Sequence, residues 1–167
     1  MAIEPYNFEN QTISASGLAA INRALFTDGA LHGCAITYSG STVRIAPGRI
    51  IIGGYVFRLT AQQTVNVSSG TSASIVVHLD LSRTSSSSSF DQIRFDVQSG
   101  SYTPTQSDLD AGSGNVYEFI LCKVTRSGSS ITGISYTAPS AHRRIYAASS
   151  QPSGAQTGDI WLVLPEE

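Results

Sequence analysis

The chain offers three histidines as candidates for catalysis or metal binding, each in an unrelated context. His32, His78 and His142 form no HxH or HExxH pairing, the arrangements that place two imidazoles on one metal ion. His78 and Asp80 are two residues apart in a predicted strand, so their side chains share a face. Because no further ligand accompanies them, we interpret the two as a hydrogen-bonded structural pair and predict no metal site.

Hydroxyl and carboxyl groups give no stronger indication of an active site. Serines are abundant, but no GxSxG nucleophile elbow is present. Gly112-Ser113-Gly114 is too short and too polar in context for a phosphate-binding loop. Asp96 and Glu118 would act as a glycosidase pair only if folding happened to bring them together. We therefore predict a protein that is not an enzyme and that binds no cofactor.

The two cysteines, Cys34 and Cys122, are far apart and belong to no CxxC pair. Each lies in an apolar run typical of a strand, which predicts two small buried thiols. A cross-strand disulfide is the alternative, and synthesis in a cytoplasm disfavours it. That origin is expected because residues 1–6 lack the basic and apolar regions of a signal peptide.

Six aromatic residues offer one binding function. They would line a sugar-binding surface if they shared a face, although strand aromatics more often fill a core or cover a sheet. These residues are Tyr55, Phe57, Tyr102, Tyr117, Tyr136 and Tyr146. A carbohydrate-binding module is therefore kept as one functional hypothesis.

The composition excludes several other classes. Of 167 residues, 41% are hydrophobic, enough for one domain with a core. Only 13% are charged, about half the usual share, and the net charge is -2 with no basic stripe. We therefore expect no nucleic-acid partner. No apolar run approaches the 18 residues of a membrane span, so we expect no membrane partner either.

One helix and a series of short strands must position these groups. Residues 14–27 predict the helix, with Ser14 or Ser16 as its cap and a stop at Asp28-Gly29. One apolar stripe recurs at helical spacing, namely Leu18, Ile21 and Leu25. Eight or nine strands follow, separated by glycine-rich turns. The pattern predicts a mainly β protein, a β-sandwich or barrel-like domain of short antiparallel strands with one N-terminal α-helix.

Particular segments carry further expectations. The strand over residues 116–125 is apolar on both faces, which predicts a central strand covered on both sides. Residues 85–89 are five serines and predict an exposed loop. Residues 105–110 would form one helical turn, and Gly53-Gly54 a bulge or a tight turn.

The chain divides into three predicted parts. Residues 1–11 are an N-terminal arm, 12–146 the β-rich domain, and 147–167 a linker with an apolar end. Ile160, Trp161 and Leu162 in that end are predicted to contact a neighbouring chain, because aromatic anchors often dominate interfaces. The alternative is that this segment folds back as one more strand of its own domain.

Several segments in a fixed order resemble one protein family. They are Leu25-Phe26-Thr27-Asp28-Gly29 with Gly33, the hairpin 43–54, the strand 75–80, the loop with Ser99-Gly100 and Pro104, and the strand 117–124. Together they resemble the N-terminal docking domain of baseplate and tail-fibre-connecting structural proteins in siphophages and prophages of Gram-positive bacteria. The resemblance runs from about residue 12 to residue 145. Residues 151–161 also look like the termini of phage tail proteins.

Two departures limit what the resemblance carries over. The family often closes this domain with an Asp-x-Arg element, whereas residues 140–144 contain no Asp, so we expect no ion pair there. Many relatives continue into a fibre or receptor-binding region where this chain stops, which would make it a docking module without the fibre.

The resemblance implies a virion structural protein of the phage tail, made and assembled in the cytoplasm of the host bacterium. Its expected partners are other tail or baseplate proteins and copies of itself, as a homotrimer or hexamer that follows the symmetry of the tail. A module that binds glycans of the host envelope is the alternative.

Overall fold

The computed structural model describes residues 14–68, 70–83, 91–111, 114–136, 145–148, 150 and 160–163. Strands make up 56% of it and helix 10%, which confirms a mainly β, sandwich-like domain with one helix near the N-terminus. No helix in these ranges is long and apolar enough to cross a membrane. The predicted arm (residues 1–11), the serine loop (85–89), the linker (151–157) and His142 lie outside the described residues.

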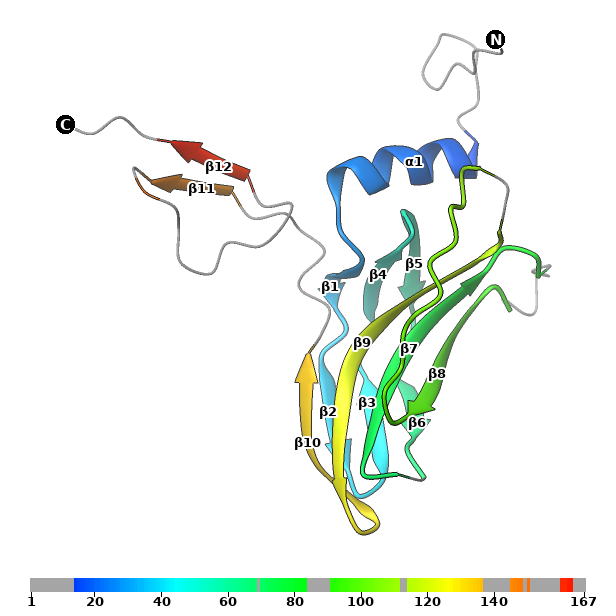
Figure 1. Ribbon diagram of the computed structural model, residues 1–167, viewed down its shortest axis with the longest axis vertical. Coiled ribbons are helices and arrows are strands. Elements are labelled where there is room, and N and C mark those ends of the chain that lie inside the picture. Colours follow the sequence, from blue (N-terminus) through cyan, green and yellow to red (C-terminus); the bar gives the residue numbers. More distant parts are fainter. Residues whose placement is uncertain are drawn as a thin grey trace, which may run out of the picture.

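One helix and twelve strands make up the described elements (Figure 1). They are α1 (Ala15–Leu25), β1 (Gly29–Gly33), β2 (Ile36–Ser39), β3 (Thr42–Ile45), β4 (Gly48–Ile52), β5 (Tyr55–Leu59), β6 (Gln63–Asn66), β7 (Ser72–Asp80), β8 (Ile93–Ser99), β9 (Val116–Ser127), β10 (Ser130–Tyr136), β11 (Ile145–Ala148) and β12 (Ile160–Val163).

One layer of the sandwich is a three-stranded meander broken in the middle. Its halves are the sheets β1-β4-β5 and β2-β3-β6. Because β1 runs into β2, β3 into β4 and β5 into β6, the two halves repeat the same order of chain segments. Across the break, the N–H of Cys34 donates to the carbonyl of Pro47 (3.2 Å) and that of Ala46 to Ala35 (2.9 Å). This break is one reason for there being more strands than predicted.

Glycines allow the close approach at the break. Gly33 has φ +69°, and a Cβ there would lie 2.5 Å from the carbonyl oxygen of Pro47. A Cβ at Gly48 would collide with the backbone of His32 and Cys34. The two glycines therefore let neighbouring strands cross the kink without losing contact.

The second layer is the antiparallel sheet β10-β9-β7-β8, which lies in front of the meander in Figure 1. The prediction of a central strand over residues 116–125 is confirmed, since β9 pairs with both β10 and β7. The prediction that both its faces are covered is wrong over its second half, where Lys123 and Thr125 are exposed. The pairing register shifts between Ile75 and Val76, so Leu121 and Cys122 both enter the core.

The core lies between the two layers and is built of aliphatic side chains. Its fully buried members come from both layers and include Val43, Ile45, Ile50, Ile52, Ile75, Val77 and Cys122. Ile93, Phe95 and Val97 of β8 pack against it with partial exposure.

The two sides of the sandwich differ. On one side β10 is joined to β2: the N–H of Ile131 donates to the carbonyl of Gly40 (2.8 Å), and the Tyr136 hydroxyl donates to the carbonyl of Ile36 (3.2 Å). On the other side β8 faces β5 and β6, and each of these is the last strand of its sheet. Among the described residues, hydrogen bonds therefore close the sandwich on the β2–β10 side, whereas on the other side β6 and β8 approach each other without being neighbours in a sheet.

The structure also decides two predictions about short segments. Residues 105–110 do not form a helical turn; Gln106 makes a bridge to Tyr117 instead, because the segment runs beside the first half of β9. Gly53-Gly54 is a tight turn rather than a bulge, with Ile52 opposite Tyr55 and φ of +52° and +82° at the two glycines.

Candidate interaction surfaces

Helix α1 is held to the domain by polar contacts with the β4–β5 turn. Ser14 caps it, its hydroxyl accepting from the N–H of Gly17 (3.0 Å). Asn22 Nδ2 donates to the carbonyl of Gly54 (2.9 Å) and Arg23 Nη1 to that of Gly53 (2.7 Å). A Cβ at Gly54 would collide with the helix backbone at the Ala19 carbonyl, so the absence of a side chain permits this docking.

Two carboxylates reinforce the same contact. Arg23 forms an ion pair with Asp110, and Asp28 Oδ1 accepts from the N–H of Gly53 (2.7 Å). Burial raises the pKa of Asp28 above its ordinary value, although the Gly53 hydrogen bond and nearby Arg23 act in the opposite direction. The helix is thus anchored mainly through hydrogen bonds and charge.

The predicted apolar stripe of α1 exists but does not pack on the core. Leu18, Ile21 and Leu25 are 50%, 37% and 56% exposed, whereas the buried helix residues are the small Gly17 and Ala19. The helix therefore packs through its small residues and turns its large apolar residues outward. An amphipathic helix normally buries such a stripe, so these three residues, the α1 stripe, form a candidate interface.

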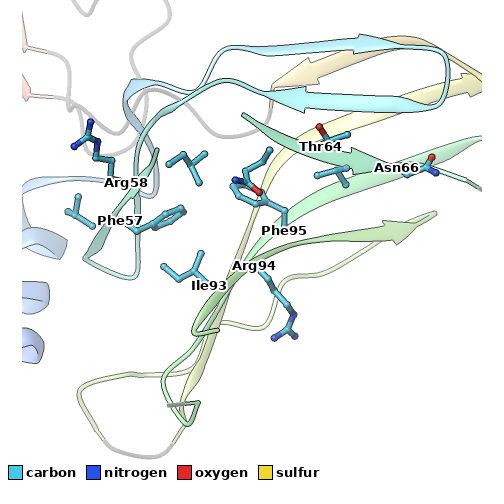
Figure 2. A pocket seen from close by; sticks show the side chains of 11 residues that line it. Phe57, Arg58, Thr64, Asn66, Ile93, Arg94 and Phe95 are labelled. Atoms are coloured by element: carbon cyan, nitrogen blue, oxygen red, sulfur yellow. The ribbon is translucent and has the colours of Figure 1, made fainter. Parts of the chain in front are cut away.

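A groove of about 830 Å³ occupies the open side of the sandwich. Its walls are the edge strands β5, β6 and β8, and Figure 2 shows Phe57, Ile93 and Phe95 pointing toward one another across it. Arg58 and Arg94 are the only charged residues of its described lining, and both point away from its centre in the same view. The groove is thus apolar inside and basic at its margin.

A polar cluster lies on the outer face of β7, β8 and β9. His78 Nδ1 is 2.7 Å from Glu118 Oε1, its cross-strand partner, and 3.7 Å from Asp96 Oδ2. Glu118 Oε2 accepts from the Tyr102 hydroxyl (2.6 Å) and from the N–H of Thr105 (2.8 Å). The predicted pairing of His78 with Asp80 is wrong, because Asp80 binds Ser82 and Arg83 at the end of its strand.

The cluster holds Glu118 ionised. Burial by itself raises the pKa of Glu118, but hydrogen bonds from Tyr102, Thr105 and His78 outweigh it, so the pKa lies below its ordinary value. The hydrogen bond to Glu118 raises the pKa of Tyr102 to about 12. Since the carboxylate accepts, the proton of the His78 ring sits on Nδ1.

This geometry favours a structural role for the cluster. His78 and Glu118 are only 8% and 4% exposed, and the polar atoms that they share are used in contacts within the protein. In the described ranges, no group of three His, Cys, Asp or Glu side chains could hold a metal ion. Asp96 and Glu118 lie on either side of His78 Nδ1, although the sequence gives no reason to expect them close together. The one indication of a polar cluster in the sequence is Glu118 itself, a glutamate between apolar residues of a predicted strand.

The cysteines and aromatics fall in separate places. Cys34 and Cys122 are free and buried, as predicted, and burial raises the pKa of the Cys122 thiol to about 12. Tyr55, Phe57 and Tyr117 pack against the core, and Tyr102 binds Glu118. Tyr136 is 61% exposed and lies on the β2–β10 side. The described members of the aromatic set therefore do not form one surface.

The predicted interface residues Ile160, Trp161 and Leu162 lie in β12. This strand pairs in parallel with β11, with Trp161 opposite Tyr146. Their role in an interface is still a prediction.

No protein-family model matches the chain, and no curated protein matches it significantly. The likeness to phage tail proteins therefore rests on the segments quoted above.

Proposed function

We propose that this protein is a structural part of a bacteriophage tail or baseplate, which joins or decorates tail components by protein–protein contacts. The observation that carries the assembly role is the α1 stripe. Three large apolar side chains are held outward on a helix whose orientation is fixed by hydrogen bonds to the β4–β5 turn. A solvated stripe of this kind is stabilised when another protein surface covers it.

The composition supports the same proposal. Charged residues amount to 13% of the chain, so few charges are available to keep sheet edges apart from other chains. The phage context comes from the resemblance of residues 12–145. A tail part sits on a threefold or sixfold axis, which favours a homotrimer or a homohexamer over a dimer.

Immunogold electron microscopy tests the phage context. Antibody against the purified protein is applied to particles induced from the strain that encodes it, with antibody against the major capsid protein as control. We expect gold at the tail and the protein in the mass spectrum of density-purified particles. Purified particles that contain capsid protein but lack this chain would refute the proposal.

A second contact is proposed for the C-terminal residues Ile160, Trp161 and Leu162. Deletion of residues 151–167 should then leave a folded protein with weaker assembly. An unfolded product would instead show that the segment is part of its own domain.

One observation favours the alternative, a carbohydrate-binding module of the host envelope. A polar hollow of about 290 Å³ is lined by Ser72, Ser74, Ser101, Tyr102 and Lys123, with Ala73 and Gly100. An aromatic ring beside hydroxyl groups suits a sugar. A glycan array that shows specific binding, lost in Tyr102→Ala and retained in the exposed Tyr136→Ala, would establish this function.

A further inference from the structure

On the open side of the sandwich, the described residues of β8 face β5 and β6 without the hydrogen bonds that join the two layers on the other side. On the closed side β10 donates hydrogen bonds to the carbonyl of Ile36 in β2 and to that of Gly40 directly after it. On the open side, among the strands that the structure describes, β8 has only β7 as a sheet neighbour, while β5 and β6 have only β4 and β3. Edge strands present unpaired N–H and C=O groups that can pair with another extended chain. Two layers thus expose edges to the same groove.

The groove has the shape and chemistry for an added strand. It runs along three strands and has an apolar interior formed by Phe57, Ile93 and Phe95 (Figure 2). A strand lying in it would direct alternate side chains inward. Its margin carries Arg58 and Arg94, and Arg94 is already paired with Asp96 (2.9 Å). Arg58 is therefore the charge that a segment with an acidic residue beside apolar ones would complement.

The first residues of the chain have this composition. Residues 3–9 read Ile-Glu-Pro-Tyr-Asn-Phe-Glu. Tyr6 and Phe8 fall on one face of an extended strand, with Glu4 at the start of that face, whereas Glu9 follows on the opposite face. Residues 1–13 contain two glutamates and no lysine or arginine. Pro5 lacks an N–H and is compatible with an edge position.

We propose that the groove receives residues 3–9 of a second copy of this chain as an added β-strand, with Tyr6 and Phe8 inserted between the two layers. This inference rests on the proposed assembly through the α1 stripe. The segment precedes α1 by the five residues 10–14, and α1 packs beside β5, which lines the groove. Copies that associate through α1 therefore bring the segment of one copy next to the groove of its neighbour.

Photo-cross-linking of the full chain tests the proposal. Phe8→p-benzoylphenylalanine places an aromatic cross-linker on the inserted face, and Tyr136→p-benzoylphenylalanine is an exposed control outside the groove. Equal amounts of light and nitrogen-15-labelled protein are mixed, unfolded, refolded together and irradiated. Mass spectrometry then identifies the cross-linked peptides.

We expect position 8 to cross-link to residues 55–66 or 93–95, in light–heavy pairs at the proportion of random mixing. Cross-links within single copies only would overturn the proposal in favour of each chain's own segment. Cross-links to other residues in an oligomeric sample would overturn the groove as the binding site of residues 3–9 but would leave the proposed assembly unaffected. Light scattering on the same sample makes this distinction, since a monomer at all concentrations would remove the proposed assembly as well.

A charge exchange provides a second readout. Arg58→Glu should lower the cross-linked fraction roughly fivefold, the effect of about 1 kcal/mol. Glu4→Arg or Glu9→Arg in the same chain should restore it. Lys123→Glu, an equivalent charge reversal at an exposed position of β9, should have no effect. Equal losses in Arg58→Glu and Lys123→Glu, without rescue, would contradict the proposed pairing.

Discussion

Replacing Glu118 by alanine should destabilise the domain by about 3–5 kcal/mol, the usual cost of removing one partner from a buried charged pair. The structure supports this magnitude. Glu118 is 4% exposed and accepts from His78 (2.7 Å), Thr105 (2.8 Å) and Tyr102 (2.6 Å). Alanine leaves the buried His78 donor without an acceptor, at about 1–3 kcal/mol, and removes the hydrogen bond from the exposed Thr105, at about 1 kcal/mol. Tyr102 is half-buried and can reach water.

Denaturant unfolding at pH 7 measures the effect, with two graded controls. Glu118→Gln keeps the volume but sets an amide N–H₂ against a donor, so it should cost about 1–3 kcal/mol. Tyr102→Phe removes one hydrogen bond and should cost about 1 kcal/mol. In a thermal melt, each 1 kcal/mol corresponds to roughly 2–4 °C. If the free energy of unfolding of Glu118→Ala lies within about 1 kcal/mol of the wild-type value, the Glu118 carboxylate does not make these hydrogen bonds in solution.

The same cluster predicts a pH dependence. The pKa of Glu118 is depressed in the folded protein relative to its ordinary value of 4.5. Its contribution to stability is therefore complete above about pH 4.5 and is lost as the pH falls through the folded pKa. The free-energy difference between wild type and Glu118→Gln should shrink below pH 4.5. A difference that stays constant down to pH 3 would contradict this reasoning.

Three further outcomes are expected. Leu121→Asp should abolish soluble folding, because Leu121 is 3% exposed in the core and a buried unpaired charge costs several kcal/mol. A variant that melts within a few degrees of the wild type would contradict the core position of Leu121. Gly54→Ala should destabilise the domain more than Gly100→Ala. Both glycines have positive φ, where a side chain costs about 1–2 kcal/mol, but of the two only Gly54 would also place its Cβ against the backbone of α1. Equal melting temperatures of the two variants would refute the close approach of Gly54 to α1. Their surroundings raise the pKa of the Tyr102 and Tyr117 hydroxyls to about 12, so their contributions to the free energy of unfolding are present below pH 10 and are lost as the pH rises through 12. Tyr102→Phe and Tyr117→Phe should each remove part of the late phase of the phenolate absorbance titration. A wild-type titration that is complete near pH 10 would contradict the raised pKa.

Local features of the fold were predictable because their causes are local. The Ser14 cap and the spacing of Leu18, Ile21 and Leu25 predict α1, and Gly40 and Gly53-Gly54 predict hairpin turns. The direction of the stripe was not predictable in the same way. Helical spacing shows that a face is apolar but not which surface covers it.

The site depends on pairings between distant strands. His78 meets Glu118 across 40 residues, in a register shifted where Ile75 gives way to Val76. A shift of one residue moves every side chain beyond it to the opposite face. The sequence alone therefore favours Asp80, the nearest acidic neighbour on the strand, as the partner of His78. The groove is not predictable for a related reason, because it lies between edge strands whose neighbours depend on the whole topology.

The assembly role of the α1 stripe is tested most directly by size-exclusion chromatography with light scattering at increasing protein concentration. We expect the wild type to reach the mass of a trimer or hexamer, and Leu25→Glu and Leu18→Glu to remain monomeric. Their melting temperatures should be nearly unchanged, since both side chains are exposed. Ala24→Glu, which adds the same charge at an exposed position beside the stripe, should assemble like the wild type. A wild type that stays monomeric at high micromolar concentration, or a Leu25→Glu variant with the wild-type mass, would contradict the account.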